Sequence, residues 1–167
     1  MPQFERRYIA DYCAERFPEG GYQLNYPLGP IPRGVGEEVD YAVAARFYRP
    51  LRPSVDAVKF YDDRLVVLET KVHKAWHVLG QLLLYGHLVQ YTEELRPWWG
   101  KPVELRIIMP EISPLVREIC QSVGIYPERY VTDYIAEQQA HYDRYWTKEY
   151  QTHIQERNAI RRALNVE

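Results

Sequence analysis

The sequence predicts an α/β fold in which helices flank a mixed central sheet and a helical extension follows. Strand-like and helix-like segments alternate from residue 54 to residue 123, an order that places neighbouring strands in parallel through a crossover helix. After residue 130 the pattern is helical, with no later strand to pack on. We therefore expect an α/β domain over 1–130 and a tyrosine-rich helical extension over 131–167.

Composition predicts a sizeable core and gives no global sign of a nucleic-acid partner. A length of 167 residues suits one domain, and the hydrophobic content is 46%. The formal net charge is -2, so attraction to nucleic acid would need a local basic patch. Two cysteines, a first segment without the apolar core of a signal peptide, and no apolar run near the roughly 20 residues of a bilayer span predict a cytoplasmic protein with no membrane segment.

The first third of the chain contains three expected elements. Residues 3–17 place apolar side chains at helical spacing, and the PEGG sequence that follows ends this helix. A loop rich in proline and glycine comes next, with a short strand expected at 22–26. The apolar segment 39–48, closed by Pro50 and Pro53, is predicted to be a strand.

A hairpin, a helix and another strand are expected next. Residues 54–71, SVDAVKFYDDRLVVLETK, form two apolar runs on either side of Asp62 and Asp63, which is typical of a hairpin. Residues 72–95 carry apolar side chains at a period of 3.6, which predicts a long buried helix. Residues 103–110 form a strand, which we expect to lie parallel to the second hairpin strand.

The last helix of the predicted α/β domain is bounded by clear signals. Ser113 is a suitable N-cap, and Pro114 follows at the first helical position. The helix continues through LVREICQSV and ends at Gly124.

Two acidic side chains of the hairpin occupy positions where a simple apolar hairpin would carry none. If Asp62 and Asp63 form a two-residue turn, Asp56 lies directly opposite Glu69. A three-residue loop would shift the pairing by one residue and separate them. In the expected pairing Lys71 projects from the same face as Glu69, whereas Thr70 points the other way.

This arrangement favours a metal site. Opposed carboxylates with Cβ atoms ~5 Å apart repel by about 3 kcal/mol at an effective dielectric constant of 20. A divalent cation such as Mg²⁺ or Mn²⁺ prefers oxygen ligands and would reverse that repulsion between Asp56 and Glu69. Lys71 could then position or activate a water that attacks the substrate, or balance charge in the transition state. The alternative is that Glu69 and Lys71 are a surface ion pair on an edge strand, with Asp56 at a turn.

The residues resemble the PD-(D/E)XK nuclease superfamily, in which one hairpin strand carries Asp and the next carries E-x-K. The matching residues are Asp56 and Glu69-Thr70-Lys71, with Ser54 where the motif has proline. The likeness covers about residues 3–125. It implies a restriction-endonuclease-like core and a deoxyribonuclease that uses Mg²⁺ or Mn²⁺, with Asp56, Glu69 and the backbone carbonyl of Thr70 as metal ligands.

Two further elements extend the resemblance. Gln81 and Tyr85, one helical turn apart, match the Q-x-x-x-Y element of RecB-like members, which implies that they orient Lys71 or the substrate. Many members also use an acid on the first helix. On a helical wheel Glu5 lies in the middle of the apolar face and Glu15 lies towards its margin, so Glu5 is the expected fourth metal-site residue. The alternative for Glu5 is a surface acid at a fraying helix end.

Three features outside this site carry weaker signals. His73 and His77 have i, i+4 spacing, but packing or phosphate contact suits them better than metal binding. Trp98 and Trp99 are more typical of a cover on the core than of a base-stacking platform. Residues 46–76 have an excess of basic side chains, which would suit phosphate binding.

Two functions remain open from the sequence. The first is a metal-dependent nuclease acting on DNA. The second is a catalytically silent nuclease-fold module, structural or DNA-binding, within a larger assembly. Aromatic residues make up 14% of the chain, and 131–167 is longer than the core requires, so this extension is the expected contact for a second copy or a protein partner.

Overall fold

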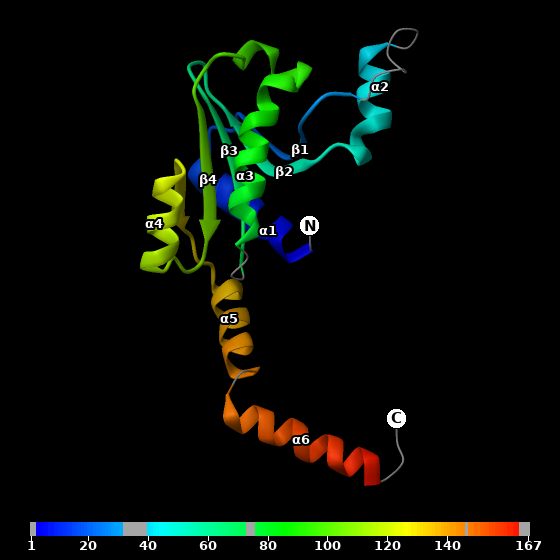
Figure 1. The fold of residues 1–167 in the computed structure, drawn as a ribbon, viewed down its shortest axis with the longest axis vertical. Helices are drawn as coiled ribbons and strands as arrows, with labels where there is room; N and C mark the ends of the chain where they lie inside the picture. The colour runs from blue at the N-terminus through cyan, green and yellow to red at the C-terminus, as the bar shows by residue number, and fades with distance from the viewer. Residues whose placement is uncertain (1–2, 32–39, 73–75, 146, 164–167) are drawn as a thin grey trace. The chain divides into compact units, whose positions relative to one another are not determined.

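A five-stranded mixed sheet lies at the centre of residues 1–130 in the computed structural model (Figure 1). The structure describes residues 3–31, 40–72, 76–145 and 147–163. The strands lie side by side in chain order: β1 (Tyr22–Pro27), β2 (Ser54–Phe60), β3 (Leu65–Thr70), β4 (Val103–Met109) and β5 (Ile125–Arg129). β2 pairs antiparallel with both β1 and β3, and β3, β4 and β5 are parallel. The predicted α/β class with a mixed sheet is therefore confirmed.

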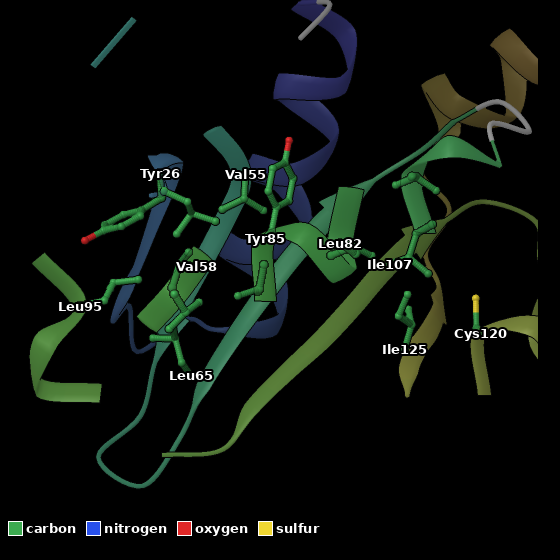
Figure 2. Close-up of a cluster of buried hydrophobic side chains, with 14 of the residues drawn as sticks. Tyr26, Val55, Val58, Leu65, Leu82, Tyr85, Leu95, Ile107, Cys120 and Ile125 are labelled. Carbon is green, nitrogen blue, oxygen red and sulfur yellow. The ribbon is translucent and has the colours of Figure 1, made fainter. Parts of the chain in front are cut away.

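Helices cover both faces of this sheet (Figure 1). α1 (Gln3–Arg16) packs against β1, β2 and β3 on one face. α3 (His77–Leu88) and α4 (Pro114–Ser122) contribute side chains to a large apolar cluster with the strands on the other. Figure 2 shows part of this cluster, in which Leu82 and Tyr85 of α3 meet apolar side chains of the sheet. The Ser113 Oγ accepts a hydrogen bond from the amide of Val116 at 3.3 Å, so the predicted N-cap of α4 is confirmed.

The segment predicted to be a strand at 39–48 is instead helical. α2 spans Tyr41–Tyr48 and is followed by the 3-10 turn η1 (Arg49–Leu51). The Asp40 Oδ1 accepts hydrogen bonds from the amides of Ala42 and Val43, at 2.9 and 3.4 Å, and so caps the helix. Alanines support helix more than strand, and this local preference together with the cap outweighed the apolar run that suggested a strand.

The predicted helix over 72–95 is shorter than its apolar pattern. Residues 73–75 lie outside the described residues, and α3 ends at Leu88. The chain continues as two 3-10 segments, η2 (Val89–Tyr91) and η3 (Glu93–Trp98). Thr92 between them has an extended backbone, and its hydroxyl donates to the carbonyl of Leu88 and accepts from the amide of Gly29. These two side-chain hydrogen bonds end the helical run.

One strand, β5, falls in a stretch between Gly124 and Tyr130 for which the sequence predicted no element. β5 contains Pro127, a residue that argues against a strand because it lacks an amide donor. β5 is the last strand in the sheet order, bonded to β4 alone, so it accommodates the proline on its outer side. The parallel pairing predicted for the 103–110 strand is confirmed by the contact between β3 and β4.

Residues 131–167 form a second unit. It contains α5 (Asp133–Tyr145) and α6 (Lys148–Ala163). The Thr147 Oγ1 accepts a hydrogen bond from the amide of Tyr150 at 3.3 Å, which caps α6. Across the described ranges, no helix has the length and apolar character that crossing a membrane would require.

Candidate functional site

The candidate site lies where β2 and β3 part. Their pairing follows the predicted register and ends at Ala57 opposite Leu68. Beyond this point β2 stays paired with β1, and β3 stays paired with β4. Asp56 and Glu69 are the next residues of the two strands, so the carboxylates enter the fork between them. The hydrogen bond that closes the predicted two-residue turn is also present: the amide of Tyr61 donates to the carbonyl of Arg64 at 3.0 Å.

The Asp56 carboxylate bridges the fork to β3. Its Oδ2 accepts hydrogen bonds from the backbone amide of Thr70, at 2.8 Å, and from the Thr70 hydroxyl. Asp56 is 5% exposed and Thr70 is fully buried. The expectation that the Thr70 side chain points away from Asp56 is therefore wrong, because the strands separate and the carboxylate reaches between them. A threonine between the Glu and Lys was the available sequence signal for this contact.

The Glu69 carboxylate makes the reciprocal contact with β2. Its Oε2 accepts a hydrogen bond from the backbone amide of Asp56 at 3.3 Å, and the Glu69 residue is 4% exposed. Each acid of the pair thus binds the main chain of the opposite strand. These contacts replace ladder hydrogen bonds and hold both carboxylates in the fork.

Lys71 and Glu5 complete the charged groups around the pair. The Lys71 Nζ lies 3.6 Å from Glu69 Oε1 and 3.8 Å from Glu5 Oε2. Glu5 comes from the first turn of α1 and is close enough to raise the pKa of Asp56 through its charge. Glu15 lies elsewhere and accepts a hydrogen bond from the Tyr130 hydroxyl at 3.0 Å. The structure therefore brings Glu5, and not Glu15, to the cluster.

The two buried carboxyl groups favour a proton or a cation. Burial raises the pKa of Asp56, and the hydrogen bonds from Thr70 and the charge of Lys71 oppose that rise. Burial, and next the negative charge of Asp56, raise the pKa of Glu69 to about 8. The physical cause in both cases is that a carboxylate removed from water loses hydration that its neighbours only partly replace.

Tyr85 and Gln81 both belong to α3, and Tyr85 lies close enough to the pair to feel the charges of Glu69 and Asp56. Figure 2 shows Tyr85 beside Val55 of β2, with its hydroxyl directed away from the other labelled side chains. Burial raises the pKa of Tyr85 to about 12, and the charges of Glu69 and Asp56 add to the rise. The Gln81 Oε1 is buried and has no hydrogen-bond partner among the described residues. Such an atom can accept a hydrogen bond from a lysine, a water or a ligand.

The donor set suits a hard divalent cation. The atoms that converge are carboxylate oxygens, and Mg²⁺ is commonly held by one or two carboxylates while its remaining positions take water and substrate phosphate. Within the described ranges, no group of three or more histidine, cysteine, aspartate or glutamate side chains is arranged to hold a metal ion. Asp56 and Glu69 are the two carboxylates that would hold such a cation, and Glu5 lies beside Lys71.

The remaining candidates are two histidines and two tryptophans. His73 is outside the described residues, and His77 is exposed. Trp98 packs on Phe60, with ring centroids 5.0 Å apart, and its indole donates to the carbonyl of Tyr61 at 2.8 Å. Trp99 is 39% exposed but also donates to a backbone carbonyl, that of Val89, at 3.0 Å. Trp98 is thus the core cover that was predicted, and Trp99 lies at the rim.

The local basic excess is weaker than its sequence count. Arg52 is buried and its guanidinium pairs with Glu94, with Nη1 to Oε1 at 2.6 Å. Lys59 is buried and pairs with Glu19 at 2.6 Å. These two cations join elements of the fold. The expected basic excess over 46–76 therefore depends on residues other than Arg52 and Lys59.

Comparison with known proteins finds similarity in fold. No protein-family model and no curated protein matches the chain. Two similar solved structures are a crystal structure of a repair endonuclease from Pyrococcus abyssi, at 22% identity and a TM-score of 0.45, and a structure of an EndoMS-dsDNA2 complex, at 18% and 0.42. Each match covers 75% of this chain, and 46% and 44% of the respective known chains. The chain therefore spans less than half the length of either protein.

Proposed function

We propose that the protein is a metal-dependent nuclease that hydrolyses phosphodiester bonds of DNA. The observation that carries the proposal is the buried pair of Asp56 and Glu69 at the fork of β2 and β3, with Lys71 3.6 Å from Glu69. Opposed buried carboxylates destabilise a fold unless a proton or cation compensates them. DNA as the substrate comes from the sequence resemblance in the D, E-x-K and Q-x-x-x-Y elements.

In this proposal Asp56, Glu69 and the backbone carbonyl of Thr70 hold Mg²⁺ or Mn²⁺, and Glu5 supports the site through Lys71. When bound, the metal supplies a Lewis acid that lowers the pKa of a water and neutralises charge on the phosphate. The Thr70 amide and hydroxyl fix the orientation of Asp56. The Asp56 amide fixes that of Glu69.

The lysine acts on the attacking water. The Lys71 ammonium lies between two carboxylates, at 3.6 and 3.8 Å, and its side chain is 15% exposed, so it reaches solvent at the edge of the site. A cation in this place positions a nucleophilic water or stabilises charge that develops on the phosphate. Gln81, with its unpaired buried Oε1, and Tyr85 orient the lysine or the substrate from α3.

The test is cleavage of supercoiled, linear and single-stranded DNA with Mg²⁺ or Mn²⁺. We expect the wild type to cut at least one substrate, and Lys71→Ala and Asp56→Ala to lose at least about a hundredfold in rate. Lys101→Ala is the matched control, because that lysine binds the carbonyl of Asp62 at the turn end of the hairpin. An inactive wild type whose unfolding temperature is also unaffected by either metal would contradict the proposal and favour the catalytically silent module.

A further inference from the structure

One backbone position next to the candidate site departs from regular strand geometry. Asn25 of β1 has φ 51°, and among the described residues it is the non-glycine residue with a positive φ. Asparagine tolerates the left-handed region better than most residues, whereas β-branched residues strongly disfavour it. Asn25 is exposed, so packing of its side chain does not account for this geometry.

This left-handed residue lies directly across the sheet from Asp56. β1 and β2 pair as far as Leu24 opposite Ala57 and resume at Tyr26 opposite Val55, which leaves Asn25 and Asp56 outside the pairing. Hydrogen bonds in an antiparallel ladder recur at every second residue. The amide of Phe60 donates to the carbonyl of Gly21, and this spacing, continued along β1, would have the amide of Asp56 donate to the carbonyl of Asn25. Beyond Asn25 the amide of Leu28 donates to the carbonyl of Pro53, so the pattern of bonded pairs changes phase between Gly21 and Leu28.

Both groups have other partners in the structure. The Asn25 carbonyl accepts a hydrogen bond from Arg49 Nη2 at 3.1 Å. The Asp56 amide donates to Glu69 Oε2 at 3.3 Å. The geometry points to Asn25 as a positioning residue: its left-handed turn withdraws its carbonyl from the sheet and frees the Asp56 amide to hold the Glu69 carboxylate.

The consequence for the site follows from what a regular strand would do. With an ordinary strand conformation at residue 25, the carbonyl would return to the Asp56 amide and Glu69 would lose that donor. Glu69 would then rely on Lys71, and repulsion from Asp56 would favour its moving away. This consequence rests on the proposed metal site, whereas the hydrogen-bond exchange itself does not. Outer partners that orient a ligand commonly change metal affinity by about 10–100-fold.

A purely structural reading gives Asn25 a different role. Irregular residues on edge strands discourage pairing with other chains, and β1 is the edge strand next to β2. In that case the Asp56 amide would not depend on residue 25. The two roles of Asn25 therefore predict different hydrogen-exchange rates for one backbone amide, that of Asp56.

The first experiment measures hydrogen exchange at the Asp56 amide by NMR in four metal-free proteins: wild type, Glu69→Ala, Asn25→Val and the double variant. We expect protection in the wild type, at least about tenfold faster exchange in Glu69→Ala, and restored protection in the double variant, where the β1 carbonyl is again available. Full protection in Glu69→Ala, or none in the double variant, would overturn the inference. Glu69→Met, which retains side-chain bulk without the carboxylate, replaces Ala if that variant does not fold.

The second experiment measures Mn²⁺ binding to the full chain by calorimetry. We expect Asn25→Val to bind about tenfold more weakly and Asn25→Gly, which keeps the left-handed conformation, to bind within about twofold of the wild type. Gln23→Val is the matched control, since Gln23 is an exposed residue of the same strand without a positive φ. Equal binding by Asn25→Val and wild type would overturn the positioning role.

The two experiments separate the inference from the proposed function. A wild type that binds no Mn²⁺ contradicts the metal site, and the exchange measurement still decides whether Asn25 frees the Asp56 amide. Unfolding temperatures of all variants are measured alongside. A loss of binding in Asn25→Val that Asn25→Gly also shows would overturn the conformational explanation.

Discussion

The buried carboxyl of Glu69 makes the stability of the metal-free protein depend on pH. Its pKa is raised from 4.5 to about 8 in the folded state, so between these values the folded protein holds a proton that the unfolded chain releases. The contribution of the Glu69 proton to stability is therefore fully present below pH about 4.5 and is lost as pH rises towards 8. We expect the unfolding temperature in a chelator to fall by at least about 5 °C between pH 5.5 and pH 8.

The matched variant for this prediction is Glu69→Gln, which is neutral throughout the range. Its unfolding temperature should change much less over the same pH interval, and it should exceed that of the wild type at pH 8 without metal. Mg²⁺ should raise the wild-type unfolding temperature more at pH 8 than at pH 5.5, since metal competes with the proton. Parallel pH profiles for wild type and Glu69→Gln would show that Glu69 is not the group responsible.

Thr70 offers a second test at single-residue resolution. Its hydroxyl donates to Asp56 Oδ2 in a fully buried setting, so Thr70→Val leaves the volume unchanged and removes one donor from a buried carboxylate. We expect a loss of about 1–3 kcal/mol in unfolding free energy, measured in urea. Thr70→Ser is the control, because it keeps the hydroxyl that donates to Asp56. A valine variant that is as stable as the wild type would contradict the importance of this hydrogen bond.

Individual site residues differ in how far the sequence could reveal them. Asp56 and Glu69 were predictable as opposed residues because side chains alternate along strands and the turn at Asp62 and Asp63 sets the register. The bond from Thr70 to Asp56 was not, because it depends on where two paired strands separate. The conformation of Asn25 was also hidden, since asparagine in a strand does not by itself indicate a left-handed residue.

The helix α3 positions Gln81 and Tyr85, and two of its glycines have contrasting surroundings. A Cβ on Gly80 would meet nothing within 4 Å, whereas a Cβ on Gly86 would lie 2.9 Å from Leu105 Cδ2 of β4. Alanine is favoured over glycine in a helix by about 1 kcal/mol. We expect Gly80→Ala to stabilise the protein by about 0.5–1 kcal/mol in urea unfolding. Gly86→Ala should gain less, because Leu105 must move.

The order of these two variants is the critical result. A Gly86→Ala protein that is more stable than Gly80→Ala would mean that α3 does not approach β4 at residue 86 as closely as the structure places it. Circular dichroism at matched denaturant concentrations gives both free energies and also checks that the slopes of unfolding are unchanged.

Among the elements, those that combine an apolar period with clear boundary residues were predictable, whereas α2 and the end of α3 were not. Four elements combine an apolar period with clear boundary residues: β2, β3, β4 and α4. α2 was misassigned because its side chains are largely exposed and the cap from Asp40 decides its conformation. The end of α3 depends on Thr92 bonding to Gly29, a contact between distant segments that no local pattern encodes.

For the whole molecule, Tyr130 closes the first unit. Its amide donates to the carbonyl of Met109, its carbonyl accepts from the Tyr8 hydroxyl, and its own hydroxyl reaches Glu15. These contacts tie the end of the sheet to α1 and do not require the residues that follow. We therefore expect a chain that ends at Tyr130 to unfold cooperatively and to keep the Mn²⁺ affinity and DNA cleavage proposed for the full chain, within about threefold.

The second unit, 131–167, is proposed to serve association with another copy or a protein partner. Its helices α5 and α6 form a separate unit, and α6 exposes an apolar side chain, Ile160, at 59%. We expect light scattering after size exclusion to give a larger assembly for the full chain than for the chain ending at Tyr130. This role would be contradicted if the full chain and the chain ending at Tyr130 were both monomers of equal stability and the full chain recovered no partner that the shorter chain does not. If the shorter chain folds but no longer cleaves DNA, the second unit would instead contribute to substrate binding.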